Sequence, residues 1–110
     1  MRVKIPSKKA CEKFFLIYEL EGCQKALNFL SRHYGVRRMR IILDGRRVGK
    51  GDVACYFRNR AYFTKRGLTK RTVLHEFYHH LVDVNGQDIP DRIEVGEANN
   101  YVREVLGRHS

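Results

Sequence analysis

The sequence has no long hydrophobic run, few cysteines and no leader-like segment. No stretch approaches the roughly eighteen consecutive apolar residues of a membrane-spanning helix, so no span is expected. The N-terminal MRVKIPSKKACEKFF lacks a continuous apolar segment with a small-residue cleavage site, which argues against a signal peptide and favours a cytoplasmic protein. Cys11, Cys23 and Cys55 form no CxxC pair, which argues against a disulfide framework and a four-cysteine zinc site. Each is expected to be a small buried hydrophobe, and Cys55 has a minor alternative role as a metal-binding thiolate.

Acidic residues are also scarce, and they are unevenly distributed. The 110 residues carry a net charge of +10 and are 43% hydrophobic, enough for one folded domain spanning 1–110. Residues 1–74 hold 19 Lys and Arg against five Asp and Glu, whereas residues 75–110 hold three against seven. A basic N-terminal part can attract nucleic acid, anionic lipid or acidic peptides, or can be a solvated surface.

Local patterns predict an α+β domain without internal repeats or low-complexity tracts. N-terminal helices, a small three-stranded sheet and two C-terminal helices are expected. A helical stretch is expected from Ser7 to Gly35, and Gly22 bends or divides it. Strands are expected at 36–43, 52–58 and 61–65. The two C-terminal helices are expected from Thr69 or Thr72 to about Val84, and from Pro90 and Asp91 to about Leu106, where Gly107 stops the second.

The stretch TVLHEFYHHLVDV carries an HExxH motif on the first of the two C-terminal helices. His75 and His79 are four residues apart, so they project from the same face and can share one metal ion. Glu76 is displaced by about 100° around the helix axis and can reach a metal-bound water without binding the metal. Apolar neighbours indicate a half-buried helix, where imidazoles and a carboxylate need partners. We therefore predict a Zn²⁺ site, against the alternative that these histidines hydrogen-bond to the backbone or to Asp83.

A catalytic zinc needs a third protein ligand and an open position for water. The final helix supplies three candidate carboxylates, Glu94, Glu97 and Glu104. Glu97 is preferred because it follows Gly96, which permits close approach of the backbone, and precedes small and amide side chains. Glu94 is the second choice, since it lies nearer the start of the helix.

HEFYH followed by GEAN on a downstream helix resembles the pattern of the gluzincin metallopeptidases. The size and order of the elements resemble the minigluzincins, minimal archaeal domains described as latent forms and similar to catalytic domains of the membrane-embedded CAAX prenyl endopeptidases. This resemblance covers about residues 36–106. It implies His75 and His79 as zinc ligands, Glu76 as general base and acid, and Glu97 as third ligand. The pattern departs at the fourth residue after Glu97, where many gluzincins have an acid and this chain has Tyr101.

The mechanism expected from this site is hydrolysis of a peptide bond by a zinc-bound water, with Glu76 moving the proton. The substrate is expected along an edge strand, for which AYFTK at 61–65 is the preferred segment. Asp83 could orient the ring of His79, and Asn100 could replace the missing acid. Candidates for stabilising the oxyanion are Tyr101, His80 and Arg92.

Two rival functions remain open on the sequence. A nucleic-acid-associated domain could use the basic N-terminal segments, interleaved with Tyr56, Phe57, Tyr62 and Phe63, although strand aromatics more often belong to the core. The basic residues concerned are Arg37, Arg38, Arg40, Arg46, Arg47, Lys50, Lys65, Arg66, Lys70 and Arg71. The other rival is a catalytically silent or latent zinc domain, in which Cys55, the N-terminal MRVKIP or the C-terminal GRHS fills the open metal position.

Overall fold

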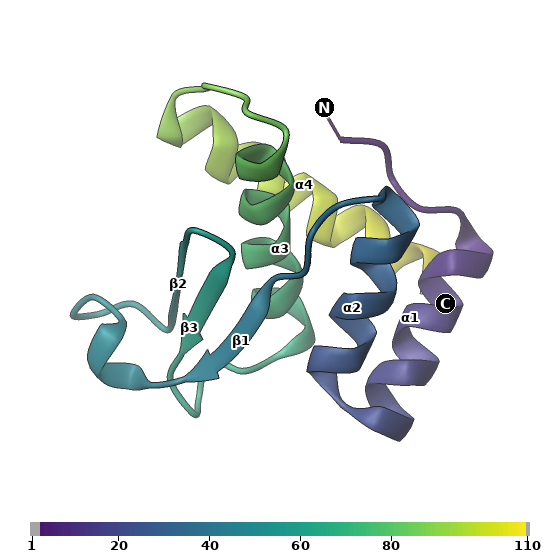
Figure 1. Ribbon diagram of the computed structural model, residues 1–110, viewed down its shortest axis with the longest axis horizontal. Helices are drawn as coiled ribbons and strands as arrows, with labels where there is room; N and C mark the ends of the chain where they lie inside the picture. The colour runs from purple at the N-terminus through teal and green to yellow at the C-terminus, as the bar shows by residue number, and fades with distance from the viewer. Residues whose placement is uncertain (1–2, 110) are drawn as a thin grey trace.

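Four α-helices and a three-stranded sheet make up residues 3–109, the part of the chain described by the computed structural model (Figure 1). In chain order these are α1 (Lys8–Glu21), α2 (Cys23–Tyr34), β1 (Arg40–Leu43), the short 3-10 helix η1 (Gly45–Arg47), β2 (Ala54–Phe57), β3 (Arg60–Phe63), α3 (Lys70–Val84) and α4 (Asp91–His109). The predicted α+β class is confirmed. None of the described helices has both the length and the apolarity needed to cross a membrane.

Glycine divides the N-terminal helices but does not end the last one. Gly22 has a φ of 97°, which an L side chain rarely adopts, and it separates α1 from α2 as the sequence predicts. The prediction that Gly107 stops α4 is wrong, because the helix continues to His109. The Arg108 guanidinium donates a hydrogen bond of 3.2 Å to the Pro6 carbonyl, which ties this last turn to the N-terminal segment.

The strands are shorter than the sequence predicts. β1 begins at Arg40 rather than Val36, because a tertiary contact occupies part of the expected strand: the Arg37 carbonyl accepts a 2.6 Å hydrogen bond from the Nε2 of His80 on α3. β3 ends at Phe63 rather than at residue 65, and it begins one residue earlier than predicted, after a two-residue turn of Arg58 and Asn59, both with positive φ. Such a turn matches the twist of an antiparallel hairpin.

The sheet has the order β1-β3-β2, which corrects the predicted substrate strand. The segment 61–65 falls largely in β3, the central strand, which pairs in parallel with β1 and antiparallel with β2. Its backbone groups are therefore used on both sides, and it cannot accept a peptide. Gln24 of α2 covers the outer edge of β1 by accepting from the Ile41 amide at 2.8 Å and donating to the Met39 carbonyl at 3.0 Å. β2 is the strand with an edge left for a ligand.

Helix α3 runs through the middle of the molecule, between the sheet and the other helices (Figure 1). The side chain of Thr69 caps the start of α3 by accepting a hydrogen bond from the Thr72 amide. Thr69 is one of the two residues predicted as the cap. Phe77, Leu81 and Leu74 are buried in the core with Phe63 of β3. This packing fixes the rotation of α3 and turns His75, Glu76 and His79 towards β2 and α4.

Gly67, between β3 and α3, is held against the segment that leads into β2. A Cβ at this position would lie 2.1 Å from the Val53 carbonyl oxygen, which is backbone and cannot move aside alone. We expect Gly67→Ala to lower the free energy of unfolding by about 1–3 kcal/mol or more, as overpacking does. Gly96→Ala is the matched control: Gly96 lies in α4 with nothing within 4 Å of its Cβ position, so up to about 1 kcal/mol of stabilisation is expected. Urea unfolding of both variants measures the difference, and equal midpoints would contradict the close approach.

Candidate active site

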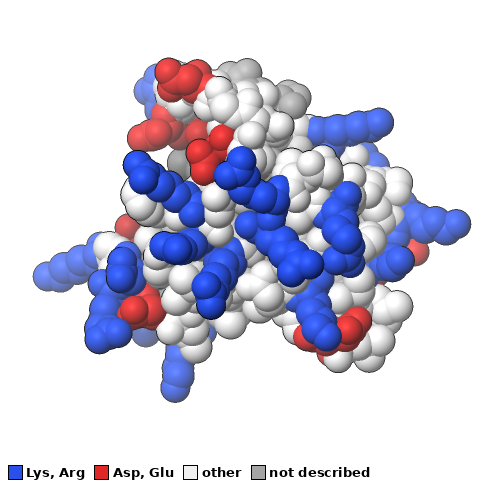
Figure 2. All heavy atoms as spheres, viewed as in Figure 1, with Lys and Arg blue, Asp and Glu red and all other residues white. Residues whose placement is uncertain are grey.

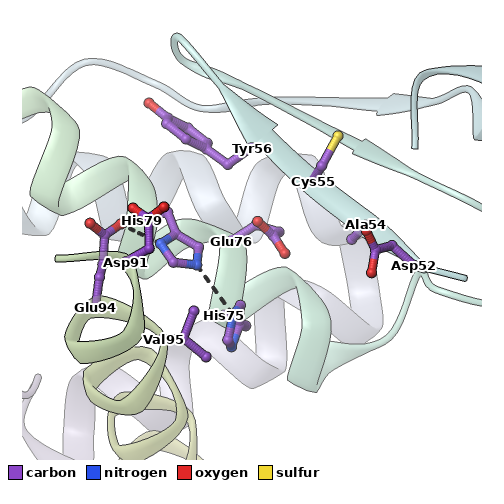
Figure 3. A pocket seen from close by; sticks show the side chains of 10 residues that line it. All are labelled: Asp52, Ala54, Cys55, Tyr56, His75, Glu76, His79, Asp91, Glu94 and Val95. Carbon is purple, nitrogen blue, oxygen red and sulfur yellow. Dashed lines mark hydrogen bonds and ion pairs between the residues drawn. The ribbon is translucent and has the colours of Figure 1, made fainter. Parts of the chain in front are cut away.

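A cavity of about 580 Å³ lies between β2, α3 and the start of α4 (Figure 3). It brings the predicted HExxH residues together with carboxylates from two other elements. Its lining residues are Asp52, Ala54, Cys55, Tyr56, His75, Glu76, His79, Asp91, Glu94 and Val95. Four of these are acids and two are histidines, while no Lys or Arg of residues 3–109 lines the cavity. In a chain with a net charge of +10, this is an isolated acidic site.

The imidazoles of His75 and His79 converge at the floor of the cavity (Figure 3). Their Nε2 atoms are 3.2 Å apart. Two nitrogens bound to one tetrahedral zinc at about 2.0–2.1 Å are separated by about 3.3 Å. Burial lowers the pKa of His75, and the neighbouring His79 lowers it further, so His75 is neutral with a lone pair available. The pair therefore has the spacing that a shared metal ion requires.

Each imidazole is held by a side chain from α4. The Nδ1 of His79 is in contact with the Glu94 carboxylate, which assigns a ring proton to Nδ1 and directs Nε2 towards His75. His75 forms a side-chain hydrogen bond with Asn99. Metal-binding histidines usually have such partners, which fix the tautomer and the orientation of the ring.

Glu76 lies in the cavity wall beside the imidazole pair and is only 7% exposed. Burial raises the pKa of its carboxyl, Asp52 raises it further, and His79 opposes both by lowering it. A carboxylate in this environment is a stronger base than an exposed one. Among residues 3–109, no hydrogen-bond partner holds the Glu76 carboxylate away from a ligand in the cavity.

The structure separates the two preferred candidates for third ligand. Glu94 lines the cavity and touches His79, whereas Glu97 lies outside it and its Oε1 accepts a 2.6 Å hydrogen bond from the Tyr78 hydroxyl. Glu104 is exposed further along α4. Val95 is the α4 side chain beside His75 in Figure 3, so that part of the wall is apolar. As the side chains of residues 3–109 stand, no three His, Cys, Asp or Glu residues surround a metal position, and Glu94 is the carboxylate nearest the pair.

The predicted supporting residues lie outside the cavity. Asp83 accepts a 2.7 Å hydrogen bond from the Tyr56 hydroxyl and does not orient His79. Tyr101 is buried, 3.0 Å from the Tyr34 hydroxyl, and Asn100 accepts from Arg103 on the surface. Among the oxyanion candidates, His80 is buried between Tyr56 and the Arg37 carbonyl, and Arg92 is exposed and absent from the cavity wall.

The groups proposed to block the open metal position do not reach it: Cys55 borders the cavity with its thiol turned away, and the described parts of the two terminal segments lie elsewhere. The thiol of Cys55 points to the far side of β2 and donates to the Arg47 carbonyl at 3.3 Å (Figure 3). Val3 and Pro6 are buried on the opposite side of the molecule, where the Lys4 carbonyl accepts from Tyr34. The described end of α4 reaches Pro6, and neither terminal segment lines the cavity within residues 3–109. All three cysteines are free, and only Cys11 is fully buried as predicted.

Sequence reasoning missed four residues of this site. Asp52, Tyr56 and Asp91 line the cavity, and Asn99 holds His75. The signal for Asn99 is its place in α4, one turn after Val95, where it faces α3. For Tyr56 the signal is its place on β2, and for Asp52 its place two residues before that strand; both become useful only once the strand order is known.

Compared with models of protein families, with curated proteins and with solved structures, the chain matches none of them. The resemblance to minigluzincins stays a prediction from the motif and the element order.

Proposed function

We propose that the chain is a zinc-dependent peptidase whose metal site is built on His75 and His79. The observation that carries this proposal is the pair of Nε2 atoms 3.2 Å apart, beside a buried carboxylate in a cavity bordered by a strand edge. Two imidazoles and a carboxylate are a donor set that suits zinc. Glu94 is the carboxylate that the cavity offers as third ligand, in place of the Glu97 expected from the sequence, and it would have to leave the Nδ1 of His79 to bind the metal.

Each step of the reaction can be assigned to a part of the cavity. A bound Zn²⁺ would polarise the scissile carbonyl and lower the pKa of the attacking water to about 7. Glu76 accepts the proton of that water and delivers it to the leaving amine. The outer edge of β2 offers unpaired backbone groups to an extended peptide. In the metal-free chain, Glu94 and Asn99 keep the two imidazoles in position.

The charge of the cavity indicates the kind of peptide that binds there. Two of the four acids in the cavity have roles in the proposed reaction, Glu76 towards the water and Glu94 towards the metal. The other two, Asp52 and Asp91, lie at opposite ends of the cavity (Figure 3). No described Lys or Arg neutralises them within the cavity wall. Peptides that carry Lys or Arg on both sides of the scissile bond are therefore the substrates of choice.

Zinc titration and peptide cleavage test the proposal together. The purified wild-type chain is expected to bind about one Zn²⁺ and to cleave quenched fluorescent peptides rich in Lys and Arg. His79→Ala is expected to lose both properties. His33→Ala is the matched control, because His33 is exposed on α2 and outside the cavity, and it should retain both.

The outcomes separate this proposal from its rivals. A wild-type chain that binds no zinc refutes the metal site. If the chain binds zinc through His79 but cleaves no peptide, and removal of residues 1–2 does not restore cleavage, the catalytically silent domain is indicated instead. Cleavage that persists in His79→Ala would point to a contaminating peptidase or to another site.

A further inference from the structure

The outer face of the sheet, turned away from α3, carries a set of arginines that the cavity does not use. Arg40 of β1 and Arg60 of β3 are direct partners in the parallel register, so their side chains lie next to each other. Ala61 and Phe63, which alternate with Arg60 along β3, are buried in the core. Arg40 and Arg60 therefore share the opposite, exposed face.

A groove of about 540 Å³ runs over this face between η1 and the strands. It is lined by Arg40, Arg47 and Arg60, together with Ile42 and Tyr62, and we call it the arginine groove. The guanidinium of Arg47 lies 5.5 Å from the centre of the Tyr62 ring, which forms part of the floor. Asp44, the acid in its wall, is paired with Arg46 at 3.1 Å.

The three arginines of the arginine groove have no ion-pair partner among residues 3–109. Guanidinium groups without a carboxylate present a row of donors whose geometry matches phosphate oxygens. Figure 2 shows that Lys and Arg spread across the face carrying β1 and α2, whereas Asp and Glu gather near the start of α4 and the α1–α2 turn. The face seen in Figure 2 is therefore strongly basic over the sheet and α2.

An exposed aromatic ring lies next to Arg60, outside the lining of the arginine groove. Phe57, at the end of β2, is the antiparallel partner of Arg60 and is 59% exposed. The Arg58 guanidinium lies 5.2 Å from the centre of its ring. A ring in this position gains nothing from the core, which contains Tyr56 instead. Aromatic rings on a basic strand surface are the means by which proteins stack unpaired bases.

We propose that the arginine groove binds single-stranded nucleic acid, with Arg40, Arg47 and Arg60 contacting phosphates and Phe57 stacking on a base. The groove lies on the outer sheet face, and the proposal requires neither the metal nor the peptidase activity. If the chain is a peptidase, this surface would hold it beside basic proteins bound to the same strand, which are the substrates that the acidic cavity favours. The anionic surface of a membrane would use the arginines but would give Phe57 no stacking partner.

Fluorescence anisotropy with a labelled oligo-dT strand of about twenty nucleotides tests the proposal. Arg40→Ala/Arg60→Ala is expected to weaken binding about tenfold or more. It should also lower the slope of log affinity against log salt by about 1.4, which corresponds to two lost phosphate contacts on a single strand. Phe57→Ala is expected to weaken binding about fivefold or more with no change in that slope. Because Phe57 and both arginines are exposed, these variants should keep the wild-type unfolding midpoint.

Lys8→Ala/Lys9→Ala is the matched control, since it removes the same charge from α1, away from the sheet. This control is expected to bind oligo-dT within about twofold of wild type. Equal losses in the two double variants would overturn the proposal in favour of net charge alone. If the wild-type chain does not bind oligo-dT at about 50 mM salt, the proposal is wrong. It is also wrong if the chain binds phosphatidylserine vesicles through Arg40 and Arg60 but does not bind oligo-dT. Glu76→Gln should bind oligo-dT as wild type does, so failure here is distinguishable from failure of the peptidase proposal.

Discussion

Replacing Glu76 by Gln is expected to reduce the rate of peptide hydrolysis by about 10²–10⁴-fold, the contribution of a well-placed general base. Glutamine has nearly the same shape but cannot accept the proton of the attacking water. His75 and His79 are untouched, so the variant should bind zinc about as well as wild type. Comparison of turnover rates at equal zinc occupancy measures the effect. An unchanged rate would show that Glu76 does not move the proton.

The same substitution should make the metal-free chain more stable at neutral pH. Burial raises the pKa of Glu76, so the folded state binds the proton more tightly than the unfolded state does. The wild-type chain therefore loses stability as pH rises from the unfolded pKa, about 4.3, through the higher folded pKa. Glu76→Gln has no such loss, and its advantage should widen over that range in thermal unfolding. Glu12→Gln, exposed on α1, is the control and should show no comparable change.

Glu94→Ala is expected to weaken zinc binding by at least about 10–100-fold, whereas Glu97→Ala should leave it within about twofold of wild type. Glu94 touches His79 in the cavity, and its loss removes either a ligand or the group that orients the imidazole. Glu97 contacts the Tyr78 hydroxyl outside the cavity, so its loss should lower stability instead, by about 1–3 kcal/mol.

Competition with a chromogenic zinc chelator measures the affinities, and urea unfolding of the metal-free chains measures the stabilities. The two variants remove the same group from positions less than one helical turn apart, so each serves as control for the other. Zinc lost only in Glu97→Ala would restore the ligand expected from the sequence and would require α4 to rotate on metal binding. Zinc retained in both variants would leave the two imidazoles without a carboxylate ligand from this pair.

Local chemistry allowed much of the fold to be predicted from the sequence. The division of the N-terminal helices at Gly22 and the cap of α3 at Thr69 could be predicted, because both depend on neighbouring residues alone. The start of β1 could not be predicted, because the Arg37 carbonyl is used by His80, 43 residues later in the chain. The position of β3 at the centre of the sheet also escaped prediction, since the parallel pairing of β1 with β3 depends on contacts distant in sequence.

The candidate site also has a part that could be predicted from the sequence and a part that could not. The convergence of His75 and His79 follows from their spacing on one helix, and the structure brings them together as expected. The choice between Glu94 and Glu97 depends on how α4 is rotated against α3. That rotation is set by buried residues of α4, among them Ala98 and Tyr101, whose partners lie on other elements. The helical periodicity predicts the faces of α4, but it does not predict which of two adjacent faces meets the imidazoles of His75 and His79.

Within residues 3–109, β2 is the strand that keeps an open outer edge, and this edge predicts the direction in which a peptide would lie in the cavity. Antiparallel pairing is the more stable arrangement, and a peptide that adopts it runs opposite to β2. Because β2 passes from Ala54 near Asp52 to Tyr56 near Glu94 and Asp91, such a peptide enters over the start of α4 and leaves past Asp52 (Figure 3). The residues before the scissile bond would then face Asp91, and those after it would face Asp52. Reversing one of these two charges should change the preference on one side of the cut while leaving the other side as it was.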